Sequence, residues 1–73
     1  MTALSNAVEI YTVYYNTLDY PGLYVVRRWL NDVPTDDVHT AKTLEEIRNF
    51  VPPDKVFLDR MPGDDPVIVE TWL

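Results

Sequence analysis

The segments of this chain that predict β-strands are apolar on both of their sides. Residues 8–15, 23–30 and 66–73 are rich in β-branched and aromatic residues, which is typical of strands. A strand that faces water on one side alternates apolar with polar residues. In residues 8–15, by contrast, Ile10 and Val13 fall on opposite sides. A sheet built from such strands needs cover on two faces.

Only one segment predicts a helix that could supply this cover. Thr43 and Glu46 have the spacing of a capping box, and apolar residues recur at helical spacing between Leu44 and Val51. The prolines at residues 52–53 end the helix. A helix of about eight residues is only ~12 Å long, so it covers about a third of one face of a four-stranded sheet.

Two proline–glycine pairs predict tight turns between strands. Pro21 with Gly22 and Pro62 with Gly63 suit the central positions of type II turns, because proline fixes φ and glycine accepts a positive φ. The first pair predicts a hairpin of the two N-terminal strands, and the second joins a strand at residues 55–60 to the C-terminal strand.

Residues 31–42 are predicted to be mostly connection, with a short extended piece at residues 38–41, because proline and three aspartates interrupt them. The resulting order, ββ(β)αββ, predicts an α+β domain. It has a mainly antiparallel four- or five-stranded sheet with one short helix on one face.

The chain length predicts a single domain over residues 1–73, in which residues 1–7 form a mobile N-terminal segment. Small domains near the limit of stability recruit disulfides, metals or partner chains. The sequence contains no cysteine and one histidine, His39. Association with another chain is therefore the support that the composition leaves open.

The charge balance argues against two classes of partner. A formal net charge of -6, with six scattered Lys and Arg residues, does not suit phosphate contacts, so we expect no direct nucleic-acid binding. The same charge opposes an anionic membrane surface. The sequence shows neither a signal-peptide pattern nor a membrane span, and the expected localisation is cytoplasmic.

The aromatic side chains of the strands form the candidate site. We expect the aliphatic residues to lie under the helix and Glu70 to stand on the open face of the sheet with the predicted partner-binding residues. Tyr, Trp and Arg are enriched in protein interfaces. The sequence therefore predicts a non-enzymatic protein-protein interaction module, a homodimer or a binder of one other protein. The predicted partner-binding residues are Tyr11, Tyr15, Tyr24, Arg28, Ile68 and Trp72. The structural alternatives are tyrosine pairs across strands and loops that fold over the open face.

The sequence predicts no catalytic, cofactor-binding or metal-binding residue. Nucleophilic catalysis needs a nucleophile beside a base; the chain has no cysteine, one serine, Ser5, and one histidine, His39. The adjacent acids at residues 36–37 and 64–65 lack the spacing of a calcium loop and are typical of turns.

Two other functions remain open. One is an acidic inhibitor that mimics nucleic acid and binds a nucleic-acid-handling protein; the other is a small enzyme with a site at a dimer interface. The mimic would use loop acids, namely Asp32, Asp36, Asp37, Asp54, Asp64 and Asp65. It predicts binding that weakens steeply with salt.

Two stretches carry a family resemblance over the C-terminal half of the chain. The "TLEEIRNFVPP" helix with its stop and the "DDPVIVETWL" ending are similar to small uncharacterised bacterial and phage-encoded proteins. The resemblance implies no activity and transfers no site residue.

Overall fold

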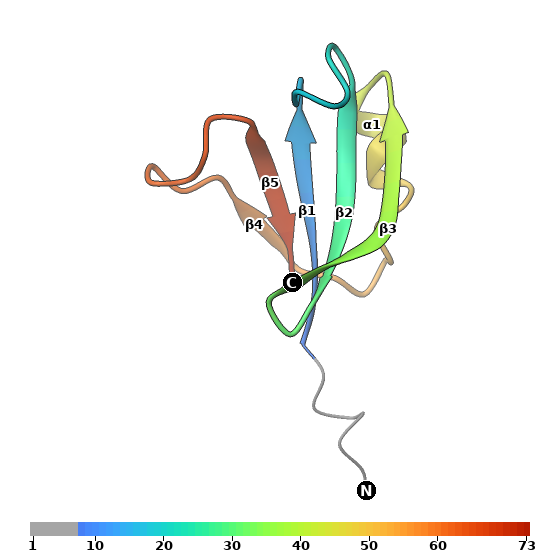
Figure 1. Cartoon of the computed structure of the whole chain (residues 1–73). Coiled ribbons are helices and arrows are strands. Elements are labelled where there is room, and N and C mark those ends of the chain that lie inside the picture. The colour runs from blue at the N-terminus through green and yellow to red at the C-terminus, as the bar shows by residue number, and fades with distance from the viewer. Residues whose placement is uncertain (1–7) are drawn as a thin grey trace, which may run out of the picture.

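A computed structural model of the chain describes residues 8–73 and shows one antiparallel five-stranded sheet with a single short helix (Figure 1). The strands lie in the order β3-β2-β1-β5-β4. This confirms the predicted fold class and the order βββαββ. The predicted mobile segment 1–7 lies outside the described residues. The elements are β1 Glu9–Tyr15, β2 Tyr24–Leu30, β3 Val33–Ala41, α1 Leu44–Arg48, β4 Phe57–Asp59 and β5 Ile68–Trp72.

The prediction that residues 31–42 are mostly connection is wrong, because β3 is the longest strand. It follows β2 through a tight turn in which Asn31 and Asp32 both have positive φ, 50° and 67°. Two successive left-handed residues are the requirement of a type I′ hairpin turn. Val38 pairs with Arg27, so the cross-strand ladder holds a segment whose composition resembles a loop.

One of the two predicted type II turns is confirmed. At the first, Leu23 N–H donates to Tyr20 C=O at 3.3 Å, and Gly22 has a φ of 75°. At the second, Asp64 N–H donates to Met61 C=O at 3.0 Å. Gly63 does not have positive φ, however, so a type II turn at this position was a wrong prediction.

The helix begins where the capping box predicts. Glu46 N–H donates to Thr43 Oγ1 at 3.1 Å, and the Thr43 hydroxyl donates to the Glu46 carboxylate at the same distance. Regular α-helix covers five residues, and tighter turns then carry the chain to Val51. Ile47 is fully buried and holds α1 on the sheet, while Val51 packs against the same core.

The helix lies against β2 and β3 on the side of the sheet that faces away from the viewer in Figure 1. The core consists of Tyr11, Val13, Val26 and Ile47. Tyr11 and Val13 are two positions apart in β1, so their side chains point to the same side of the sheet, which is the helix side. The predicted placement of Tyr11 and Glu70 on an open face is therefore wrong, because Tyr11 lies on the buried side of β1 and Glu70, which pairs with Val13 and is 2% exposed, lies on the same side.

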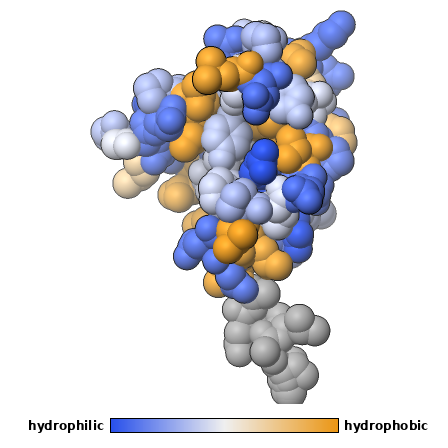
Figure 2. Space-filling view, viewed as in Figure 1, coloured by the Kyte–Doolittle hydropathy of each residue, from blue (hydrophilic) through white to orange (hydrophobic). Residues whose placement is uncertain are grey.

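No helix or strand of the described chain covers the opposite face. Val25 is nevertheless buried there, beside Tyr14 and beside Tyr20 of the β1–β2 loop. Figure 2 shows this face as separate apolar patches divided by polar residues. The face therefore offers no continuous apolar surface. No helix within residues 8–73 is long and apolar enough to cross a membrane.

Candidate interaction surface

Exposed apolar side chains gather at the β4 edge of the sheet. β4 pairs with β5 alone, and its other side has no neighbouring strand within residues 8–73. Of the eleven exposed large hydrophobic residues between residues 8 and 73, five lie on β4 or beside it. We call these five the β4 edge cluster: Val56, Phe57, Leu58, Met61 and Leu73.

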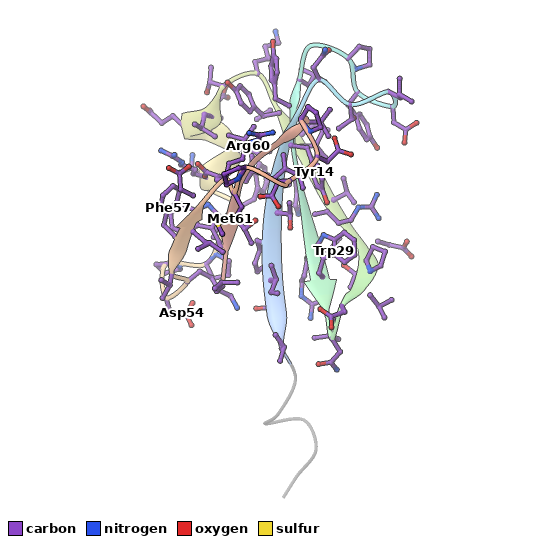
Figure 3. All side chains as sticks on the ribbon, turned by 90° about the vertical axis from the view of Figure 1, so that its left-hand side faces the viewer. Tyr14, Trp29, Asp54, Phe57, Arg60 and Met61 are labelled. Atoms are coloured by element: carbon purple, nitrogen blue, oxygen red, sulfur yellow. The ribbon has the colours of Figure 1, made fainter. Side chains whose placement is uncertain are left out.

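The cluster wraps around the edge. Phe57 pairs with Trp72, and their rings meet edge to face at 5.2 Å on the helix side. Leu58 follows Phe57 in the strand and points to the other face. Figure 3, which looks onto this edge, shows Phe57 on the same side as the helix and Trp29 on the opposite side.

The backbone of β4 also carries unpaired groups along this edge. Val56 and Leu73 exchange two hydrogen bonds, of 2.9 and 2.8 Å. In an antiparallel ladder, the backbone N–H and C=O groups of one residue bond to the neighbouring strand, and those of the next residue point away from that strand. Leu58 therefore bonds to β5, whereas the N–H and C=O groups of Phe57 and Asp59 point outward. An outward row of this kind can accept another strand.

The β3 edge, at the other end of the sheet, is protected. Pro34 cannot donate a backbone hydrogen bond, and a register irregularity lies between the partners of Arg27 and Trp29. Asp36 and Asp37 add charge along the same strand. These features oppose strand addition, so β4 is the edge that is open to a partner.

Of the predicted partner-binding residues, Tyr11 belongs to the protein's own core, and Tyr24 and Trp72 pack against that core. Tyr11 is 9% exposed, and the Lys55 ammonium nitrogen lies over its ring, 5.7 Å from the centroid of the Tyr11 ring. Burial raises the pKa of the Tyr11 hydroxyl, and the charge of Glu9 adds to this effect. Trp72 packs half-buried against the same core. The side chains of Tyr11 and Trp72 are covered largely by this chain itself.

Tyr15 and Tyr24 form the cross-strand pair that was the structural alternative. They are opposite each other in the ladder, and their ring centroids are 4.7 Å apart. Arg28 is engaged by Glu9, with Nε 2.6 Å from the carboxylate. Ile68 is half-buried opposite Tyr14, across a β-bulge in β5. The structure does not gather the six predicted residues into one exposed surface, and their role in binding a partner stays a prediction.

A buried carboxylate connects the helix to the sheet. Glu70 is 2% exposed and accepts hydrogen bonds from Arg48, at 2.6 and 2.9 Å, and from Trp72 Nε1, at 2.8 Å. Burial alone would raise the pKa of Glu70. The Arg48 and Trp72 hydrogen bonds, together with the charge of Arg48, outweigh burial, so the pKa lies below its ordinary value. This arrangement is structural.

Several of the polar residues singled out in the sequence stabilise local structure. Asp64 accepts from Met61 N–H at 2.9 Å, and Asp65 accepts from Val67 N–H at 3.1 Å. His39 stacks on Phe50 at 4.2 Å. In residues 8–73 no three His, Cys, Asp or Glu side chains lie close enough to hold a metal ion.

A hollow lies at the other end of the sheet from the β4 edge, between α1 and the end of β3. It has a volume of about 630 Å³ and a mixed lining that includes Lys42, Glu46 and Phe50. It is an open depression, and nothing in it points to one ligand.

Sequence reasoning missed the β4 edge cluster because residues 55–60 look like an ordinary strand. The signal was the run Val56, Phe57 and Leu58, which is apolar on consecutive positions in a strand flanked by charges. Such a run is apolar on both faces, and only the sheet order reveals that it lies at an edge.

Comparisons with protein-family models, with curated proteins and with solved structures find no match for this chain.

Proposed function

We propose that the protein is a non-enzymatic protein-protein interaction module and that its contact surface is the β4 edge cluster. The observation that supports this most directly is the coincidence of five exposed apolar side chains with outward backbone groups of Phe57 and Asp59. Exposed apolar patches on small domains mark sites of association. A strand edge without a neighbouring strand is a common means of binding another chain.

The proposal retains the class of function expected from the sequence and moves the surface from the open face to one edge. The predicted aromatic residues then have supporting roles. Trp72 positions Phe57 through their edge-to-face contact, and Tyr11 packs in the core. Cytoplasmic residence is part of the proposal, and the absence of cysteine is compatible with it.

Site-specific photo-crosslinking tests this function. A photoreactive amino acid replaces Leu58 at the β4 edge, and a matched variant carries it in place of Asp36 on β3. Both positions are exposed. Each variant is irradiated as pure protein and in an extract of the cells that produce it.

We expect protein adducts at position 58 and few at position 36, in at least one of the two settings. Equal yields at both positions, or no protein adduct at position 58 in either setting, would contradict the proposed surface. Circular dichroism spectra of both variants establish that a failure to crosslink does not reflect unfolding.

A further inference from the structure

We propose that the occupant of the β4 edge is a second copy of this chain, which pairs residues 54–60 antiparallel with the same residues about a two-fold axis at Phe57. This inference rests on the proposed function and names its partner. The two sheets then join into one continuous sheet through β4.

The backbone of β4 meets the first requirement of such a pair. A two-fold axis that passes through a hydrogen-bonded pair needs a central residue whose N–H and C=O both point to the other copy. Phe57 is such a residue, because its neighbours Val56 and Leu58 are the ones that bond to β5. The N–H of Asp59 points to the same side and can donate to the second copy as well.

The side chains meet the second requirement, because the segment is complementary to itself. Read against its own reverse about Phe57, every acid faces a base and every apolar residue faces an apolar residue. The facing pairs are Phe57 with Phe57, Val56 with Leu58, Lys55 with Asp59, and Asp54 with Arg60. Directly opposed unlike charges and apolar pairs stabilise a ladder, whereas like charges destabilise it.

Other registers lose this match. An axis at Leu58 keeps outward groups facing each other but sets Phe57 opposite Asp59 and Val56 opposite Arg60. A shift by one residue sets outward groups against inward ones, which breaks the hydrogen bonds. The self-complementary order of charges therefore favours a copy of this chain over an unrelated strand.

The two charge pairs are not equally available. Lys55 Nζ already donates to Glu9 C=O at 2.8 Å and lies 3.2 Å from the Glu9 carboxylate. Arg60 and Asp54 are exposed, and the Arg60 guanidinium makes one long bond of 3.3 Å to Asp64 C=O. The pair of Asp54 with Arg60 of the second copy is therefore the one to test.

Sedimentation equilibrium of the pure protein measures the association. A short strand edge makes a small interface, which is typical of weak complexes, so the range should extend to about 1 mM. Four proteins are compared: the wild type, Asp54→Arg, Arg60→Asp and the control Asp36→Arg. The control makes the same charge change as Asp54→Arg, but on the protected β3 edge.

We expect a concentration-dependent dimer for the wild type and for Asp36→Arg. Asp54→Arg and Arg60→Asp each oppose like charges twice in the dimer, so each raises the dissociation constant about tenfold. An equimolar mixture of these two variants restores both pairs in a heterodimer and returns the affinity close to that of the wild type. A folding defect in either variant would not produce this rescue.

Three results would overturn the inference. The first is a wild type that stays monomeric over the whole range, and the second is a dimer that neither charge variant weakens. The third is a mixture that associates no better than its components. If crosslinks at position 58 still form to another protein in the extract, the proposed surface stands and only its occupant is wrong.

Discussion

At the scale of single residues, Glu70 is the most deeply buried charged group in residues 8–73. It accepts from Arg48 and Trp72 and thereby fixes α1 to β5. We expect Glu70→Ala to lower the free energy of unfolding by about 2 kcal/mol, because it leaves the part-buried Trp72 indole N–H and the Arg48 guanidinium without their acceptor. The cost stays below that of a fully buried ion pair because the Arg48 side chain is 45% exposed and can turn to water. Urea unfolding followed by tryptophan fluorescence measures it.

Glu45→Ala serves as the control for that measurement. Glu45 is exposed in the first turn of α1, where replacing a carboxylate changes the free energy of unfolding by about 0.5 kcal/mol or less. A Glu70→Ala effect as small as this would contradict the structural role of the Arg48–Glu70–Trp72 arrangement.

The lowered pKa values of two carboxylates, Glu70 and Glu9, predict how the free energy of unfolding depends on pH. The Arg28 hydrogen bond is the main cause that lowers the pKa of Glu9 below 4.5, and Glu70 is lowered as well. A carboxyl with a lower pKa in the folded state stabilises the fold above its unfolded pKa and loses this contribution as pH falls through the folded value. We therefore expect stability to be level near neutral pH and to fall with acid below about pH 4.5.

Glu70→Gln tests which carboxylates are responsible. The amide cannot be protonated in this range, so the variant should lose less stability between neutral and acidic pH than the wild type does. Glu9 remains in the variant and keeps part of the acid sensitivity. An identical pH dependence of both proteins in urea unfolding would contradict the role of Glu70.

At the scale of elements, the β2–β3 turn is strained at a position that glycine would relax. Asp32 has a φ of 67°, in the left-handed region that non-glycine residues adopt at a cost. Asp32→Gly turns the pair into Asn-Gly, the favoured type I′ sequence. We expect a gain of about 0.5 kcal/mol in the free energy of unfolding, measured in urea. Asn31 is best left unchanged because its Oδ1 accepts from Val8 N–H at 2.9 Å.

The matched control is Asp36→Gly in β3. Asp36 does not have positive φ, so glycine adds only backbone freedom there and should destabilise by about 0.5–1 kcal/mol. If both substitutions destabilise to the same extent, the turn is not strained in solution.

Local sequence signals predicted where helices, strands and turns lie better than they predicted which side chains are buried. The Thr43 capping box and the Gly22 turn were predictable because each depends on residues a few positions apart. β3 was not, because its ladder with β2 stabilises a segment of poor strand composition. Which face of β1 is buried was not predictable from local signals either. Tyr11 and Val13 share a side, and only the packing of Ile47 onto that side decides that both are buried.

At the scale of the whole molecule, the cover of the sheet comes from irregular chain as well as from the helix. The helix contacts β2 and β3, while Val51 and Lys55 lie over the core and over Tyr11. A segment without periodicity gives no sequence signal of this role. The predicted mismatch between a small helix and a large sheet is therefore met in part by the chain itself. The β4 edge is the surface at which we propose the association that this mismatch led us to expect.

Amide hydrogen exchange can distinguish the free edge from the paired one within a single strand. In the monomer, the Leu58 amide bonds to β5 and should exchange slowly, while the amides of Phe57 and Asp59 point outward and should exchange fast. In the proposed dimer, the Phe57 and Asp59 amides donate to the second copy. We therefore expect their exchange to slow as the protein concentration rises, while the exchange rates of the Leu58 amide and of the amides of β3 do not change.

If Phe57 exchanges as slowly as Leu58 at the lowest concentration, the outward orientation of its backbone is wrong. If its rate is independent of concentration, this edge does not pair with a copy of itself.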